Sequence, residues 1–285
     1  MTAPMPGLSD TPSVPRRKVC LIGIDGLRHD IAIGEGAMPT LVQLAETGRF
    51  HPMTIAAPTW SGPSWSTILT GATIAEHGIT DNSFVGSTLA RHPDLLSRAF
   101  YADQSTTTFA AAAWPPLVDP HGLGPVIHER REQKQAGLHH VVVRDGETYG
   151  YRTADADIAQ ASLWMLHHIG PDASFIYLCE ADEAAHGHGA RSPEYGAALS
   201  RVNAHLDSLV AVLTDRQSRE EEEWLIVVVT DHGHLDEGGH GGDTPIERAA
   251  FVVTRHLTGD QLDWPEQIEP SELSARILGY LARRD

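Results

Sequence analysis

The sequence predicts an α/β fold built on a doubly wound, mostly parallel central sheet with helices on both faces. Short apolar runs of strand length alternate along the chain with longer segments in which Ala, Leu and Ile recur every three or four residues. One of these runs, residues 224–230, is continuously apolar up to its final threonine, as in strands that are covered on both sides. With 285 residues, of which 41% are hydrophobic, the chain can build one large core.

The individual elements follow from local punctuation. Strands are expected where Val, Ile, Leu or Ala runs are bounded by Gly, Pro or charged residues, and these runs are residues 18–24, 106–113, 174–179, 224–230 and 249–254. Helices are expected where the apolar period is three to four, and these segments are residues 39–48, 63–70, 153–169, 192–213 and 271–283. Pro39 and Pro63 suit a first helical turn, and Gly48 and Gly71 suit helix ends.

One domain is expected after a short tail. Residues 1–17 are rich in proline and lack an apolar period, so they predict a flexible tail, and residues 18–285 predict a single domain. Residues 114–150 are rich in Gly, His and charge and include the hairpin-like string VVVRDGETY. We expect this segment to be an insertion or cap over the sheet.

Charge and composition exclude several classes of protein. A formal charge of −17 disfavours binding to a nucleic-acid polymer. Cys20 and Cys179 lie in apolar runs and are expected to be buried, reduced thiols. The sequence shows neither a secretory signal pattern nor an apolar run long enough to cross a membrane. We therefore expect a soluble, cytoplasmic protein with no membrane partner, and we leave its oligomeric state open.

Acids and histidines follow three of the predicted strands. Ligands of open α/β sheets bind outside the carboxyl ends of the strands, and carboxylates and imidazoles are ligands for zinc and related divalent metals. A further histidine lies in a glycine-rich loop eight residues after the last of these strand-end histidines. The candidate ligands are Asp25, Asp182, His186, Asp231, His232 and His240.

Ser61 lies at the start of the helix predicted around residues 63–70. It can be read simply as the N-cap of that helix. It can equally be read as a nucleophile, because free amides and the positive end of the helix dipole favour an alkoxide and its phosphorylated form. Local sequence leaves both interpretations open.

These residues belong to motifs that resemble the alkaline phosphatase superfamily, and within it the nucleotide pyrophosphatase/phosphodiesterase (type I phosphodiesterase) family. That family has an apolar strand before Asp-Gly, a nucleophile segment followed by Thr-Gly, His-Gly and Asp-Asn, a Trp-Pro, an Asp-x-x-x-His and a Thr-Asp-His-Gly. The corresponding residues here are Asp25-Gly26, Ser61-Gly62-Pro63-Ser64, Thr70-Gly71, His77-Gly78, Asp81-Asn82, Trp114-Pro115, Asp182 with His186, and Thr230-Asp231-His232-Gly233.

The resemblance implies a two-metal hydrolase with an alkaline phosphatase-like fold, here a minimal core with a small cap insertion. One divalent ion would be held by Asp25, Ser61, Asp231 and His232, and the other by Asp182, His186 and His240. It also implies that Ser61 is the catalytic nucleophile, forming a phosphoseryl or nucleotidyl-seryl intermediate, and that Asn82 binds a phosphate oxygen. Zinc is the expected metal, and manganese also accepts such mixed Asp/His sites.

The substrate is expected to be a small phosphorylated molecule, a nucleotide-type phosphodiester or phosphoric anhydride. A phosphomonoesterase or a phosphonate hydrolase with the same centre is the alternative. A sulfatase is less favoured, because Trp65 takes the place of the arginine in the sulfatase signature. An inactive metal-binding protein is also less favoured, because no ligand of the family is missing. His29, His188 and His234 lack the spacing of the family and are expected at the surface or behind the ligands.

Overall fold

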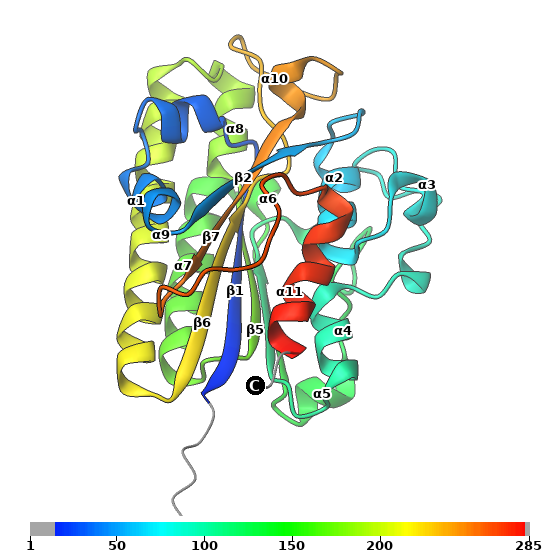
Figure 1. Ribbon diagram of the computed structural model, residues 1–285. Helices are drawn as coiled ribbons and strands as arrows, with labels where there is room; N and C mark the ends of the chain where they lie inside the picture. The colour runs from blue at the N-terminus through cyan, green and yellow to red at the C-terminus, as the bar shows by residue number, and fades with distance from the viewer. Residues whose placement is uncertain (1–14, 283–285) are drawn as a thin grey trace, which may run out of the picture.

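The computed structural model describes residues 15–282, which fold around one seven-stranded sheet (Figure 1). The strand order is β2-β7-β6-β1-β5-β3-β4. The strands from β6 to β4 run parallel, whereas β7 is antiparallel to β6, and β2 to β7. The predicted mostly parallel sheet is therefore confirmed. The strands are β1 (Arg16–Ile24), β2 (Arg49–Thr54), β3 (Thr108–Ala112), β4 (His139–Val143), β5 (Ala173–Leu178), β6 (Glu222–Val229) and β7 (Ala249–His256).

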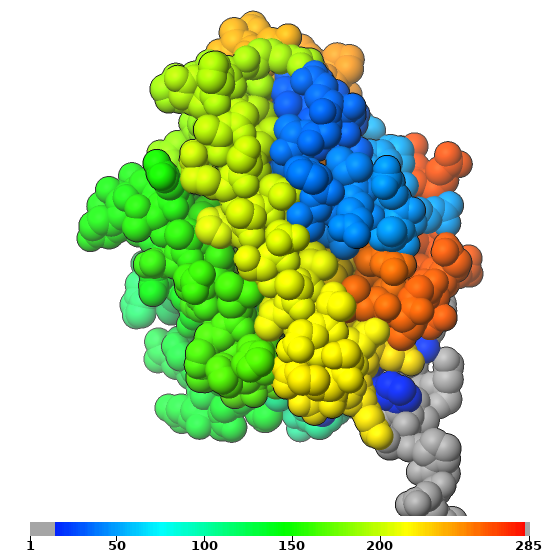
Figure 2. Space-filling model, turned by 90° about the vertical axis from the view of Figure 1, so that its left-hand side faces the viewer, coloured from blue at the N-terminus to red at the C-terminus, as the bar shows by residue number. Residues whose placement is uncertain are grey.

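Helices cover both faces of the sheet, also as predicted. α1, α7, α8 and α9 lie on one face, and α2, α4 and α11 lie on the other (Figure 1). The long helix α9 occupies the middle of the first face, between α1 and α7 (Figure 2). The helices are α1 (Pro39–Thr47), α2 (Ser61–Thr70), α3 (Ile74–His77), α4 (Leu95–Ala102), α5 (Arg131–Gln135), α6 (Gly146–Tyr149), α7 (Tyr151–His168), α8 (Glu180–His188), α9 (Pro193–Arg219), α10 (Pro245–Arg248) and α11 (Leu273–Ala282).

The helices were compared in length and hydropathy with membrane-spanning segments. In the described range 15–282, no helix combines the length and the hydropathy needed to cross a bilayer. Both cysteines, Cys20 and Cys179, are buried and free, as expected from their apolar surroundings.

The centre of the sheet brings the carboxyl ends of three strands together. β6, β1 and β5 are adjacent and parallel, and Gly23 of β1 lies beside Val229 of β6 and Tyr177 of β5. A Cβ atom on Gly23 would lie 2.5 Å from the ring of Trp65 in α2. The glycine therefore allows α2 to lie directly against β1, which brings the first residue of α2 to the same edge of the sheet.

Two strands differ from the sequence-based expectation. β2 was not predicted, because it is short and contains Pro52; it pairs only with β7 at the sheet edge, where proline is tolerated. Part of the predicted cap at residues 114–150 belongs to the sheet instead. Residues 139–143 form β4, which pairs in parallel with β3 and makes no hairpin. The apolar run thus lies at the edge of the sheet.

The start of the domain also differs slightly from the prediction. Arg16 and Arg17 belong to β1, where they pair with Glu222 and Glu223 of β6, so β1 begins two residues before the predicted start of the domain at residue 18. Residues 1–14 of that tail lie outside the described part of the chain.

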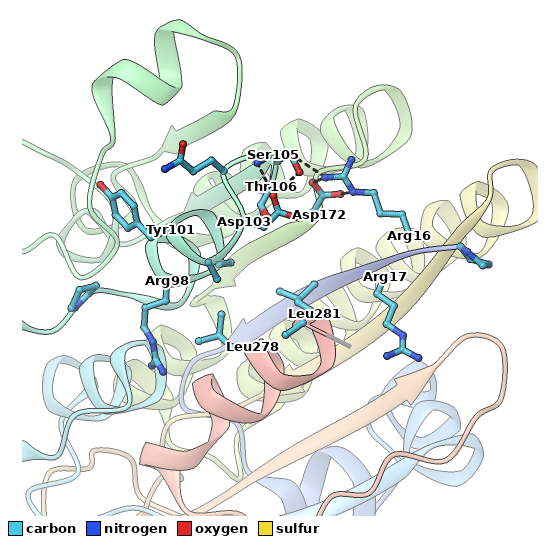
Figure 3. A pocket seen from close by; sticks show the side chains of 16 residues that line it. Arg16, Arg17, Arg98, Tyr101, Asp103, Ser105, Thr106, Asp172, Leu278 and Leu281 are labelled. Atoms are coloured by element: carbon cyan, nitrogen blue, oxygen red, sulfur yellow. Dashed lines mark hydrogen bonds and ion pairs between the residues drawn. The ribbon is translucent and has the colours of Figure 1, made fainter. Parts of the chain in front are cut away.

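A hollow of about 1370 Å³ lies at the end of the sheet where β1 begins (Figure 3). Its lining includes Arg16, the paired Asp172, and Leu278 and Leu281 of α11. Histidine is absent from the described residues that line it. The chemistry indicated by the sequence lies instead at the opposite end of β1, where Asp25 follows the strand.

Candidate metal centre

All seven residues predicted as ligands lie at the carboxyl edge of the sheet. Four of them surround the start of α2 and are buried, and we name them the inner donor set: Asp25, Ser61, Asp231 and His232. The other three lie beside them and form the outer donor set, of which the His186 side chain is exposed: Asp182, His186 and His240. Asp182 and His186 share one face of α8, as the four-residue spacing predicts.

The inner donor atoms have the spacing of a tetrahedral site. Ser61 Oγ lies 3.4 Å from Asp25 Oδ1 and 3.2 Å from His232 Nε2. His232 Nε2 lies 3.3 Å from both Asp25 Oδ1 and Asp231 Oδ2. Bonds of 2.0–2.1 Å to a tetrahedral ion imply donor atoms about 3.3 Å apart. These four side chains therefore fit one divalent ion.

The outer donor atoms are more loosely arranged, and the two histidines approach different oxygens of Asp182. His186 Nε2 lies 2.9 Å from His240 Nε2 and 3.6 Å from Asp182 Oδ2, and His240 Nε2 lies 3.7 Å from Asp182 Oδ1. The His186 side chain is 44% exposed, so this side of the centre is open to solvent. Three protein ligands beside an open position are the usual arrangement of a catalytic metal site.

The histidines of the two sets are oriented as metal ligands usually are. His240 directs Nδ1 to the carbonyl oxygen of Thr59 at 2.6 Å, and His232 directs Nδ1 to the carbonyl oxygen of Gly233 at 3.1 Å. A proton on each Nδ1 leaves the lone pair of Nε2 free, and such a second hydrogen bond fixes the ring of most metal-binding histidines. Both Nε2 atoms face the carboxylates.

The electrostatics of the buried carboxylates also favour a cation. Within residues 15–282, the ionic contacts of Asp25, Asp182 and Asp231 are made with histidines. Burial, and then the nearby Asp25 charge, raise the pKa of Asp231 well above its usual value. Its Oδ2 is buried and accepts no hydrogen bond from the described residues. A divalent ion would neutralise this negative charge.

His232 responds to the same excess of negative charge. Burial alone would lower its pKa, but Asp231 and Asp25 outweigh burial and raise the pKa to about 10. In the metal-free protein at neutral pH, the protonated ring thus lies where a cation would bind. A metal must displace that proton before Nε2 can bind it.

Asp25 is held rigidly by two aromatic side chains. Trp65 Nε1 donates to Asp25 Oδ2 at 2.8 Å, and the Tyr177 hydroxyl donates to the same oxygen at 2.5 Å. Oδ1 therefore faces Ser61 and His232. Trp65 is fully buried, so the residue that replaces the sulfatase arginine belongs to the support of the inner set.

Ser61 is the first residue of α2, and the residue before it, Trp60, is the N-cap. The Ser61 hydroxyl contacts Asp25 and His232 and caps no backbone amide, so the N-cap interpretation is wrong. Asn82 lies against the same turn, because the Gly62 N–H donates to its Oδ1 at 2.8 Å. The Ser61 N–H belongs to the first turn of α2, whose amides lack intrahelical acceptors, and it could donate to a ligand together with Asn82 Nδ2.

The sequence agrees with this geometry over most of its length. The model of the family "Type I phosphodiesterase / nucleotide pyrophosphatase" matches residues 19–255. The chain belongs to this family. It is thus a member of a family of phosphoester hydrolases, and the resemblance inferred from the sequence motifs is confirmed.

The curated relatives compared with this chain are longer proteins. The human GPI ethanolamine phosphate transferase 2, catalytic subunit, is 24% identical over 274 residues, which are 91% of this chain and 26% of the relative. Across the curated relatives that it matches, the chain spans from 8% to 44% of their length.

Solved structures share the fold at low sequence identity. Human ectonucleotide pyrophosphatase/phosphodiesterase 5 has a TM-score of 0.63 and 15% identity, and the match covers 93% of this chain and 94% of that chain. A phosphonoacetate hydrolase from Sinorhizobium meliloti 1021, in complex with phosphonoformate, has a TM-score of 0.56 and 18% identity, with 77% and 57% covered. Both likenesses establish an alkaline phosphatase-like fold.

One histidine outside the predicted ligand sets is buried at the centre. His234 was expected at the surface or behind the ligands, and it is fully buried within the group of candidate donors formed by Asp182, His232, His234 and His240. Its position two residues after His232 was the available signal, because a chain that turns tightly after a strand brings alternate residues back to the site. Cys179 Sγ also borders the centre, 4.0 Å from Asp182 Oδ2, and with Asp25 and Asp182 it forms a further group of possible donors.

Proposed function

We propose that this protein uses two divalent metal ions and Ser61 to hydrolyse a phosphodiester or a phosphoric anhydride. The observation that carries the proposal is the position of the Ser61 hydroxyl. It lies at the start of a helix and within 3.2–3.4 Å of His232 and Asp25. A serine at ordinary spacing from both ligands can share their metal.

The bound ions, zinc or manganese, would supply Lewis acidity, which lowers the pKa of the Ser61 hydroxyl and stabilises charge on the phosphate oxygens. Three carboxylates and the alkoxide together would balance the charge of two divalent ions, so the incoming phosphate brings the net negative charge. Hydrogen bonds from Trp65 and Tyr177 hold the Asp25 carboxylate in a fixed orientation. This rigidity favours a reaction that needs fixed positions.

In the first step Ser61 Oγ forms a bond to phosphorus while the bond to the leaving-group oxygen breaks. An in-line displacement sends the leaving group away from Ser61, toward the outer donor set. In the second step water cleaves the phosphoseryl or nucleotidyl-seryl ester and regenerates the serine. Asn82 Nδ2 and the Ser61 N–H would donate hydrogen bonds to the equatorial oxygens as their charge increases.

A nucleotide-type diester or anhydride is the proposed substrate class. It is supported by membership of the family, whose description includes nucleotide pyrophosphatases. The net charge of −17 argues against a polymeric nucleic acid, because a negative surface repels a long phosphate backbone.

The test is hydrolysis of bis(p-nitrophenyl) phosphate beside p-nitrophenyl phosphate by the metal-loaded protein, with Ser61→Ala as the control. We expect a preference for the diester and a loss of turnover in the variant. Preference for the monoester would contradict the phosphodiesterase assignment, and equal turnover in the variant would contradict the role of Ser61.

A phosphonate hydrolase is the second candidate, because the fold is shared with phosphonoacetate hydrolase. That reaction cleaves a carbon–phosphorus bond, which needs a leaving group that can carry negative charge on carbon. Release of phosphate from phosphonoacetate, measured beside the two nitrophenyl esters, distinguishes this candidate from the first.

A further inference from the structure

We propose that His234 is a positioning residue that orients Asp182 for metal binding by the outer donor set. The inference rests on the two-metal part of the proposed function. His234 Nε2 lies 2.6 Å from Asp182 Oδ1, a hydrogen-bond distance. A contact this short is a hydrogen bond between His234 and the carboxylate, in which His234 can act as a partner of the proposed ligand Asp182.

The two carboxylate oxygens of Asp182 have different neighbours. Oδ2 faces the ring of His186 at 3.6 Å, whereas Oδ1 faces His234. A hydrogen bond from His234 Nε2–H to Oδ1 fixes the rotation of the carboxylate, so that Oδ2 lies toward His186 while Oδ1 stays 3.7 Å from His240 Nε2.

The backbone seals this hydrogen bond from water. Gly26 has a φ of +60°, and a Cβ atom there would lie 2.6 Å from Asp182 Oδ1 and 2.7 Å from His234 Nε2. The glycine thus allows the chain after β1 to lie directly on the bond. A hydrogen bond to a carboxylate in such a water-poor place is stronger than one at the surface.

The backbone of His234 is fixed as well. Its carbonyl oxygen accepts a hydrogen bond of 2.9 Å from Arg28, which is itself buried and paired with Asp30 and Asp236. Arg28 also donates its backbone N–H to the Tyr195 hydroxyl. The ring of His234 is therefore held from both ends, by its backbone and by Asp182.

The second ring nitrogen argues against a purely structural role. His234 Nδ1 is buried and has no hydrogen-bond partner within residues 15–282. A buried, unpaired polar atom destabilises the fold, and an apolar side chain at this position would avoid that cost. The contact that distinguishes histidine from such a side chain is the hydrogen bond to Asp182.

The test compares His234→Leu with His234→Gln, because the amide nitrogen of glutamine can take the place of Nε2–H, whereas leucine cannot donate. Zinc affinity of the two sites is measured by competition with a chromophoric chelator. We expect leucine to weaken one of the two sites by about 10- to 100-fold, as losses of such partners do. Glutamine should restore that site to within a few-fold of the wild type.

Two controls keep the result interpretable. His188→Leu makes the same replacement at an exposed histidine of α8, and it should leave both affinities unchanged. Thermal unfolding of each metal-free variant checks that the leucine variant is folded, and the glutamine variant carries the test if it is not.

Several outcomes would overturn the inference. Equal losses in the leucine and glutamine variants would identify the imidazole itself as a ligand, and unchanged affinity in both would remove its role. Failure of the proposed function would be seen in the wild-type protein itself. That function is contradicted if the wild type binds fewer than two zinc ions, or if it binds two and does not hydrolyse the esters.

Discussion

Asp155 and Asp94 are buried aspartates that both accept backbone N–H groups at the start of a helix, but their pKa values shift in opposite directions. Asp155 of α7 accepts from Cys179 and Glu180, where α8 begins. Burial raises its pKa from 3.8 to about 8, although these two hydrogen bonds act against the shift. At neutral pH the folded, metal-free protein therefore holds a proton on Asp155.

Asp155→Asn is expected to change the pH dependence of the free energy of unfolding. Because the folded pKa lies above the unfolded one, the contribution of Asp155 is fully present below about pH 4 and is lost as the pH rises toward about 8. Each pH unit in this window corresponds to about 1.4 kcal/mol. From about pH 5.5 to 7.5 the wild type should lose roughly 2.7 kcal/mol relative to the variant, whose amide does not titrate.

The assay is urea unfolding of metal-free wild type and variant at several pH values in that window. Asp94→Asn is the matched control. Burial opposes ionisation of Asp94, but hydrogen bonds from His128 and Ser97 outweigh burial and lower its pKa. Its contribution is present above the unfolded pKa and is lost only as the pH falls through the lower, folded value.

The two variants should therefore behave differently. Asp94→Asn should be less stable than the wild type by on the order of 1–3 kcal/mol, and this difference should not change between about pH 5.5 and 7.5. If the difference between wild type and Asp155→Asn is also constant over this window, the reasoning about Asp155 is refuted.

Three further predictions concern the metal centre. Gly62→Ala should lower kcat at least about tenfold while both metals stay bound, because its Cβ would lie 2.7 Å from the carbonyl oxygen of Asp81 and shift the adjoining Asn82. Metal analysis beside kinetics checks this prediction, and an unchanged kcat would contradict it. Trp60→Ala should raise KM for nitrophenyl esters by about 2- to 10-fold but not for methyl esters, because the partly exposed indole lies against His240, where it can contact the ring of the substrate. Equal effects on both ester types would exclude a contact between the indole and the nitrophenyl ring. Chelation should lower Tm by roughly 5–10 °C relative to protein at about a hundredfold excess of metal over Kd, and calorimetry that finds no shift would argue against metal binding to the folded state.

Much of the fold was predictable because it depends on features that are local in the sequence. The continuous apolar character of β1, β5 and β6 identified the centre of the sheet, and their polar ends located the donor residues. The edge strands were harder to predict. β2 is short and contains Pro52, and β4 follows a segment without period, so only pairing with β7 and β3 makes them strands.

The site shows the same division. Asp182 and His186 could be placed together because helical spacing links them, and the ligand sets followed from the resemblance to a family. The contact of His234 with Asp182 depends on how tightly the chain turns after β6 and on the missing side chain of Gly26. Neither feature has a period or a composition that a sequence reveals.

The stereochemical course at phosphorus is the most direct test of the nucleophilic role of Ser61. A diester with a chiral thiophosphoryl centre would be hydrolysed by the metal-loaded protein in isotopically labelled water. Transfer to Ser61 and then to water consists of two in-line displacements, each with inversion. We predict net retention of configuration; net inversion would show direct attack by water and contradict a seryl intermediate.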